Sequence, residues 1–268
     1  MLPRIKADKV ERLLTAGLRR YVLEEAGKRG GVVGVSGGVD SAVAAVLTAR
    51  ALGAENTLLL VLPSAATPRE DIEDAMRVAE VAGVPERNIE VIDIEPLLRS
   101  FDERLGSMTP VERGNVAARI RMIILHQRGY RRGYLVVGSG DKSELLIGYF
   151  TKYGDGGVDV MPLGSLYKTW VRQLALHLGI PERIALKPSS PRLWPGQTAE
   201  GELGLSYEVI DEVLYLVFDR GLEPSEAARE AGVSEEVVER VMEMHRRSEH
   251  KRRPPPVLPL PLPDVLDF

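Results

Sequence analysis

The chain has 268 residues, 44% of them hydrophobic, which is enough for one large α/β domain or one domain with a small annex. A net charge of −4 gives no general attraction for nucleic acid, and the absence of cysteine excludes disulfides, thiolate metal sites and cysteine catalysis. The N-terminus has no apolar signal core, and no run reaches the roughly 18 apolar residues of a membrane span, so we expect a cytoplasmic protein.

The first 150 residues alternate between β-rich and helical patterns. Short apolar runs predict strands at 31–35, 57–63, 88–94 and 134–139. Amphipathic or capped segments predict helices at 7–28, 40–53, 67–83 and about 111–128. Strands and helices at this spacing form parallel βαβ units. The expected fold class is therefore α/β, a Rossmann-like doubly wound parallel sheet flanked by helices, with a helical C-terminal part.

The pattern changes after residue 148, where glycine-rich and proline-rich loops alternate with helices. Helices are predicted at 169–178, 206–219, 223–231 and 234–248, and long loops surround the first of them. No repeat and no flexible linker is visible, so we expect a single domain over 1–268. Within it we distinguish a core (1–150), substrate loops with C-terminal helices (151–253) and a polyproline-II tail (254–268).

The stretch SGGVDS, residues 36–41, joins the first predicted strand to the next helix. Its backbone N–H groups and the helix N-terminus predict an anion site, although neither GxxxxGK[ST] nor G-x-G-x-x-G is present. Asp40 suits this loop if Mg²⁺ lies between a carboxylate and phosphate oxygens. Glu144, beyond the fourth predicted strand, is the candidate second ligand. The alternative is a tight turn, with both acids stabilising helix N-termini.

SGGVDS resembles the signature of ATP pyrophosphatases, and the wider sequence resembles the ammonia-dependent NAD synthetases. The resemblance is carried by GNVAARIRM (114–122), GSGDKSELLIGYFTKYGDGGVDVMPLGSLYKTWV (138–171), LWPGQTAEGELGLSYEVID (193–211) and EHKRRPP (249–255). It implies a homodimeric ligase that converts deamido-NAD, ATP and ammonia into NAD, AMP and pyrophosphate, the last step of NAD biosynthesis. It also implies an acyl-adenylate intermediate, with Mg²⁺ as cofactor.

The resemblance further implies roles for individual residues. The ATP-binding set is Gly34, Val35, Ser36, Gly37, Gly38, Val39, Asp40, Ser41, Ser139, Lys168 and Ser190. The deamido-NAD set is Arg119, Lys152, Asp159, His250 and Lys251. Asp40 and Glu144 would hold Mg²⁺, and with Lys168 they form the expected catalytic set. Several positions depart from the family's usual pattern: Ala199 stands where aspartate is common, Asp141 where asparagine is common and Ser139 where threonine is common, and the prolines of KPSSPRLW are shifted.

Helical spacing gives a separate reason to choose Arg119. On the helix predicted at about 111–128, the expected buried stripe is Val116, Ile120, Ile123 and Ile124. Arg119 flanks this stripe on the same side as Asn115, whereas Arg121 lies about 200° from Arg119. The alternative is that Arg119 is an ordinary surface arginine.

Two other activities compete with this interpretation. The synthetase half of GMP synthetase shares SGGVDS, but GYFTKYGDGG and the ELG segment favour NAD synthetases. A nucleotide sensor without catalysis would have no use for both Asp40 and Glu144. Glutamine-dependent relatives carry an additional amidase domain with a catalytic cysteine, so the absence of cysteine here predicts free ammonia as the nitrogen donor.

Overall fold

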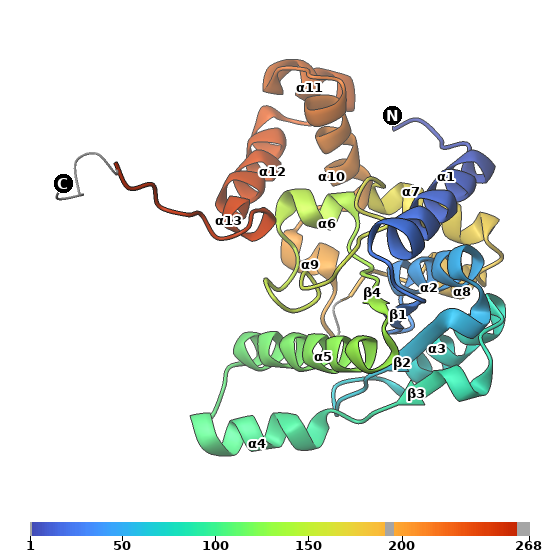
Figure 1. Cartoon of the computed structure of the whole chain (residues 1–268). Helices are drawn as coiled ribbons and strands as arrows, with labels where there is room; N and C mark the ends of the chain where they lie inside the picture. Colours follow the sequence, from blue (N-terminus) through green and yellow to red (C-terminus); the bar gives the residue numbers. More distant parts are fainter. Residues whose placement is uncertain (1, 191–195, 262–268) are drawn as a thin grey trace, which may run out of the picture.

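A four-stranded parallel sheet in the order β3-β2-β1-β4 lies at the centre of the described chain (Figure 1). The structure is a computed structural model that describes residues 2–190 and 196–261. The strands are β1 (Gly31–Gly34), β2 (Thr57–Val61), β3 (Ile89–Val91) and β4 (Leu135–Val136). Every pairing between these strands is parallel, as expected for the α/β class.

Helices cover both faces of the sheet because successive strand residues point to opposite sides. Val33 and Leu59 pack into one core, and Val32 and Leu58 pack into the other. The first core includes residues of α1 (Ala7–Arg19), its π-helical extension Arg20–Glu25, α2 (Val39–Leu52), α3 (Arg69–Ala82), α7 (Lys168–His177) and α8 (Glu182–Ala185). The second includes residues of α4 (Glu95–Leu105) and α5 (Pro110–Arg132). This arrangement confirms the doubly wound fold.

A third core packs the C-terminal helices against α6 (Lys142–Ile147) and the start of α7. Its buried residues include Tyr167, Tyr207, Ile210 and Val238. The helices of this part are α6, α9 (Ala199–Leu203), α10 (Tyr207–Leu214) with its π-helical extension Tyr215–Asp219, α11 (Pro224–Ala231), α12 (Glu235–Arg247) and α13 (Glu249–Arg252). The helical C-terminal part is therefore confirmed, while the proposed subdivision of the single domain stays a prediction.

Several predicted boundaries differ from the structure. The strands are shorter than predicted, and α4, α6, α8, α9 and α13 were not predicted as helices. The expected burial of Ile123 was wrong, since this side chain is 58% exposed. The small residues Gly114, Ala117 and Ala118 occupy the contact face of α5 together with Ile120. Small side chains let α5 lie close to the sheet. The buried face of α5 is therefore formed by these residues, and not by the largest hydrophobic side chains of the helix.

Two further expectations concern the membrane and the tail. No described helix is long and apolar enough to cross a membrane. The proline-rich tail is described only as far as Pro261, and residues 262–268 lie outside the described part of the chain. Its polyproline-II conformation stays a prediction.

Candidate functional site

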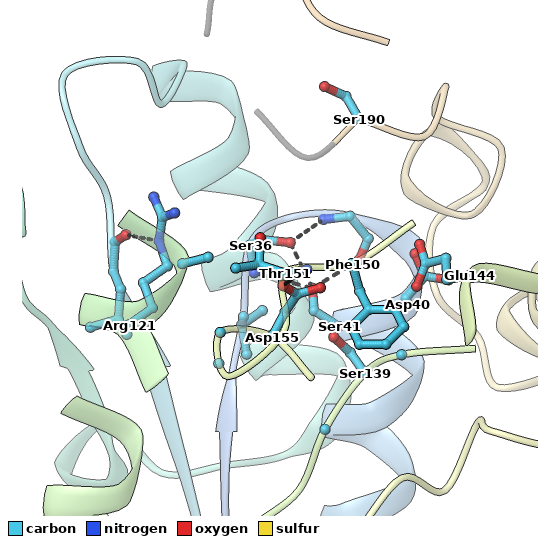
Figure 2. A pocket seen from close by; sticks show the side chains of 18 of the residues that line it. Ser36, Asp40, Ser41, Arg121, Ser139, Glu144, Phe150, Thr151, Asp155 and Ser190 are labelled. Atoms are coloured by element: carbon cyan, nitrogen blue, oxygen red, sulfur yellow. Dashed lines mark hydrogen bonds between the residues drawn. The ribbon is translucent and has the colours of Figure 1, made fainter. Parts of the chain in front are cut away.

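The carboxyl ends of β1 and β2 open into a cavity of about 610 Å³ (Figure 2). The whole loop from Gly34 to Ser41 lines it, as do Ser139, Glu144 and Ser190. These segments are far apart in the sequence, but parallel strands bring their carboxyl ends to one edge of a sheet, where such folds bind ligands. The structure thus brings together the predicted ATP-binding residues, apart from Lys168.

The loop between β1 and α2 presents donors to this cavity. Gly37 has a φ of +80°, and a Cβ there would lie 2.3 Å from the backbone oxygen of Asp71, so only glycine fits between the loop and α3. The backbone N–H of Ser36 donates to the Ser41 hydroxyl at 3.1 Å, which holds the loop curved. No side chain caps the N-terminus of α2, so the first backbone N–H groups of this helix can donate hydrogen bonds to a bound anion.

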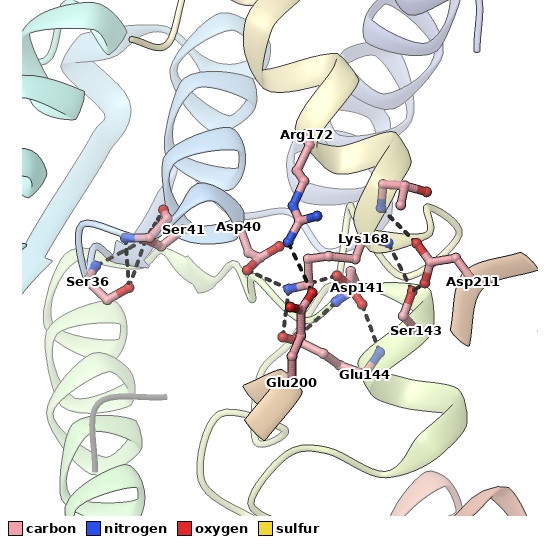
Figure 3. A network of polar contacts seen from close by, with 12 residues as sticks. Ser36, Asp40, Ser41, Asp141, Ser143, Glu144, Lys168, Arg172, Glu200 and Asp211 are labelled. Carbon is pink, nitrogen blue, oxygen red and sulfur yellow. Dashed lines mark hydrogen bonds and ion pairs between the residues drawn. The ribbon is translucent and has the colours of Figure 1, made fainter. Parts of the chain in front are cut away.

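Lys168, the first residue of α7, lies behind the loop in a cluster of carboxylates (Figure 3). Its Nζ is 2.7 Å from Asp40 Oδ2, 2.9 Å from Asp141 Oδ2 and 2.8 Å from Glu144 Oε1. The lysine is fully buried and is not among the residues that line the cavity. The predicted contact of Lys168 with ATP therefore stays a prediction. In the structure, Lys168 forms ion pairs with three acids.

A capping box fixes two of these acids. The backbone N–H of Glu144 donates to Asp141 Oδ1 at 2.8 Å, and that of Asp141 donates to Glu144 Oε2 at 3.4 Å. D-x-x-E at the start of a short helix satisfies two donors reciprocally, so the sequence itself orients this pair. The second oxygen of Asp141 is left facing Lys168.

Burial dominates the electrostatics of the cluster. Desolvation raises the pKa of Asp141 to about 6 against the opposing effect of Lys168, and it raises the pKa of Glu144 in the same way. Desolvation alone would lower the pKa of Lys168, but the three carboxylates outweigh it and the pKa is raised. The lysine is therefore held as a cation, and the acids share its charge.

Asp211 supports the cluster from α10. It is fully buried, accepts a hydrogen bond from the Ser143 hydroxyl and accepts another from the backbone N–H of Thr169 at 2.8 Å. The Ser143 hydroxyl in turn accepts from the backbone N–H of Lys168 at 2.9 Å. The first turn of α7, and with it Lys168, is thus held by a carboxylate from the C-terminal helices (Figure 3).

Asp40 and Glu144 together fit a magnesium ion. Both line the cavity, and Asp40 Oδ1 is buried without a hydrogen-bond partner among the described residues. Within that part of the chain no group of three or more histidine or acidic side chains could hold a metal alone. Two carboxylates with room for phosphate oxygens are the donor set that Mg²⁺ takes at nucleotide sites.

The predicted deamido-NAD residues are not gathered in the cavity. Arg119 Nη2 donates to the Lys152 backbone oxygen at 3.2 Å, and Lys152 Nζ donates to the His250 backbone oxygen at 2.6 Å. Asp159 accepts from the backbone N–H of Val136 at 2.7 Å, at the end of β4. None of these four predicted residues lines the cavity. Arg119, Lys152 and His250 form a connected outer region instead, and Asp159 lies apart from it at the end of β4.

Lys251 is the one predicted deamido-NAD residue that reaches the described cavity wall. Its Nζ donates to the backbone oxygens of Gly148 and Phe150, each at 2.7 Å. This contact ties α13 to the glycine-rich loop after α6, so the C-terminal helices form part of the cavity.

Two further cavity residues lie outside the predicted ATP-binding and deamido-NAD sets, although Asp155 is a second-rank candidate in the sequence. Arg121 lines the wall and donates through Nε to the backbone oxygen of Leu62 at 3.0 Å. Asp155 also lines it, accepts from the backbone N–H of Thr151 at 2.9 Å, and has its pKa raised by burial. Helical spacing favoured Arg119 over Arg121, and only the close packing of α5 shows that Arg121, next to the buried Ile120, faces inward.

A polar bridge crosses one side of the cavity. The Tyr149 hydroxyl donates to Glu202, and Gln197 Nε2 donates to the other Glu202 oxygen at 2.9 Å. The Ser190 hydroxyl donates to the Gln197 backbone oxygen at 2.6 Å. Ser190 therefore lies beside Gln197 in the cavity wall, on the same side as α9.

Comparisons with known proteins agree with this geometry. A family model described as NAD synthase matches residues 10–255. Over 250 residues the chain is 55% identical to the "NH(3)-dependent NAD(+) synthetase" of Hyperthermus butylicus, which corresponds to 92% of this chain and 89% of the relative. A relative of the same name from Saccharolobus solfataricus is 47% identical over 256 residues, 96% of this chain and 91% of the relative.

Two solved structures share the fold over their whole length. An NMN synthetase from Francisella tularensis has a TM-score of 0.83 at 32% identity and covers 96% of this chain and 100% of its own. An NH3-dependent NAD synthetase from Campylobacter jejuni has a TM-score of 0.80 at 29% identity and covers 95% of this chain and 100% of its own.

Proposed function

This chain belongs to the NAD synthase family, and from that premise we propose that it is a ligase that makes NAD from deamido-NAD, ATP and ammonia. The observation that carries the proposal is the loop Gly34–Ser41, whose open helix N-terminus lies beside Asp40 and Glu144 in one cavity. The backbone donors suit the phosphates of ATP, and the two acids would hold the Mg²⁺ that accompanies them.

The chemistry proceeds in two displacements. The nicotinate carboxylate oxygen attacks the α-phosphorus of ATP, the bond from that phosphorus to the bridging oxygen breaks, and pyrophosphate leaves with the electron pair. Ammonia then attacks the carbonyl carbon of the acyl-adenylate, AMP leaves, and a proton is released. No protein nucleophile takes part, so the residues act by positioning the substrates and by stabilising charge.

The described residues would have separate roles in phosphate binding, metal binding and positioning. The loop amides would bind the β- and γ-phosphates, and the hydroxyls of Ser36 and Ser41 lie within the same loop. Mg²⁺ held by Asp40 and Glu144 would neutralise charge on the departing pyrophosphate. Lys168 holds the two carboxylates together from behind, and Asp211 fixes the turn that carries Lys168.

Pyrophosphate release tests the activity. We expect release to require Mg²⁺ and deamido-NAD together, and NAD to form only when ammonium is added. Nicotinate mononucleotide should be compared directly, because one neighbouring structure is named an NMN synthetase. Release that depends on xanthosine monophosphate would support the GMP synthetase alternative, and nucleotide binding without turnover would support the sensor. Activity with glutamine as the only nitrogen source would contradict the assignment of ammonia.

We also propose that the active form is a homodimer. Apolar side chains are exposed along α4 and α5: Leu97, Phe101, Leu105, Val111 and Ile123. Arg119 lies one turn from Ile123 on α5, so a partner packed on this face would lie beside the outer region of Arg119, Lys152 and His250. A light-scattering mass near that of one chain would contradict the dimer. The cytoplasmic location stays a prediction.

A further inference from the structure

The cluster around Lys168 holds more negative charge than one lysine needs. Three carboxylates lie within 2.9 Å of a single ammonium, which leaves a formal charge of −2. Removing an ionised group from water is costly, and one carboxylate already balances the charge of a buried lysine, whose other N–H groups could be satisfied by neutral acceptors. A third buried acid therefore needs a reason.

The three acids are not equivalent. The side chains of Asp40 and Glu144 are each 20% exposed and line the cavity, whereas Asp141 is fully buried and does not. The backbone N–H of Glu144 holds Asp141 Oδ1, so Asp141 Oδ2 can face only inward, toward Lys168. Asp40 Oδ1 and Asp141 Oδ2 are both buried without a hydrogen-bond partner among the described residues, and Asp141 Oδ2 lies 2.9 Å from the Lys168 ammonium. The two partly exposed acids therefore lie on the cavity side, and the fully buried ion pair of Asp141 with Lys168 lies behind them.

We infer that Asp141 neutralises Lys168 from behind, so that Asp40 and Glu144 together present two negative charges to a divalent cation. The inference rests on the proposed function, since it assigns a task to Asp141 at the proposed metal site. Asp141 is a positioning residue that would not touch the metal. Without it, Lys168 would offset one of the two charges that face the cavity.

Asp141→Asn tests the inference with little disturbance of the fold. Asparagine is also a good N-cap, so α6 should remain capped while one negative charge is lost. With α,β-methylene-ATP bound, we expect Mn²⁺ binding, measured from the electron paramagnetic resonance signal of free Mn²⁺, to weaken about tenfold, as for other residues that support metal ligands. The Mg²⁺ concentration for half-maximal pyrophosphate release should rise by a similar factor.

Asp219→Asn is the matched control. Asp219 forms an ion pair with Lys142, the residue next to Asp141, and does not line the cavity. The two variants therefore change the net charge equally and differ in where the charge is lost. Asp219→Asn should bind Mn²⁺ within about twofold of the wild type. Equal weakening in both variants would overturn the inference, because net charge alone would then account for it.

A double variant separates charge from geometry. Asp141→Asn combined with Lys168→Gln removes the lysine charge as well, so two carboxylates again face the cavity without an opposing cation. We expect Mn²⁺ affinity to recover relative to Asp141→Asn alone. Absence of recovery in a variant that unfolds cooperatively would show that charge balance is not the cause.

The outcomes also distinguish this inference from the proposed function. If the wild type shows no saturable Mn²⁺ binding with the nucleotide analogue, the metal site itself is wrong. If the wild type binds Mn²⁺ and Asp141→Asn binds it equally well, the metal site stands and the role of Asp141 is overturned.

Discussion

The ATP side of the cavity and the proposed deamido-NAD region beyond its wall are built differently. The ATP side is one continuous loop, Gly34–Ser41, whose donors are mainly backbone groups between β1 and α2. The proposed deamido-NAD side is drawn from separate segments, with Arg119 on α5, Lys152 in a loop and His250 on α13. A continuous loop is completed by local folding, whereas the second side depends on how distant helices pack. The difference explains why a short motif located the first side, whereas the assignment of residues to the second stays a prediction.

The largest effect is expected at the metal pair. Asp40→Asn or Glu144→Gln should lower pyrophosphate release by about 100-fold or more, because several kcal/mol of charge stabilisation in the transition state is lost. ATP binding should persist, since the loop amides remain. Single-turnover release with deamido-NAD measures the effect. Full rates in both variants would show that neither acid serves the ATP side.

The loop backbone gives the next effect. Gly37→Ala would place a Cβ 2.3 Å from the Asp71 oxygen at a φ of +80°, so the loop or α3 must shift. We expect a loss of about 1–3 kcal/mol in the free energy of unfolding, together with weaker ATP binding. Gly38→Ala is the control, because its φ is −91° and its nearest neighbour is the Ser36 hydroxyl at 3.4 Å. Urea unfolding and nucleotide titration should separate the two variants.

Arg119 tests the other side of the comparison. Arg119→Ala should raise the KM for deamido-NAD roughly tenfold through loss of a charged hydrogen bond, while the KM for ATP stays nearly unchanged. Arg131, exposed in the last turn of the same helix, supplies the control variant Arg131→Ala. An equal rise in both KM values would mean that Arg119 does not distinguish the two sides.

The last prediction concerns the support that Asp211 gives the cluster. Burial raises the pKa of Asp211 to about 7, from 3.8 for a free aspartate. Because the folded state holds this proton more tightly, the contribution to stability is complete below about pH 4 and is lost as the pH rises through about 7. The stability of the wild type relative to Asp211→Asn should therefore fall over this range. Urea unfolding at several pH values measures it, and a constant difference would contradict the shift.

Local patterns predicted the main elements of the fold. The alternation of apolar runs and helices located all four strands of the described sheet and the longer helices α1, α2, α3, α5 and α7 that cover it, because the periods of strands and helices appear in the order of apolar residues. The short helices escaped detection, since four to six residues give too little periodicity. α4 escaped as well, and Ile123 was misassigned because small residues rather than large ones form the contact face of α5.

The sequence by itself determined the fold class, the anion loop and the pair of acids, since each depends on neighbouring residues or on the order of strands. Only the tertiary structure decided that Lys168 lies behind Asp40, Asp141 and Glu144, that Arg121 faces the cavity, and that Arg119 does not. The physical reason is that charge balance and helix-to-sheet distance are set by residues more than 20 positions apart, such as Lys168 and Asp40 at a separation of 128. No local pattern records such pairs.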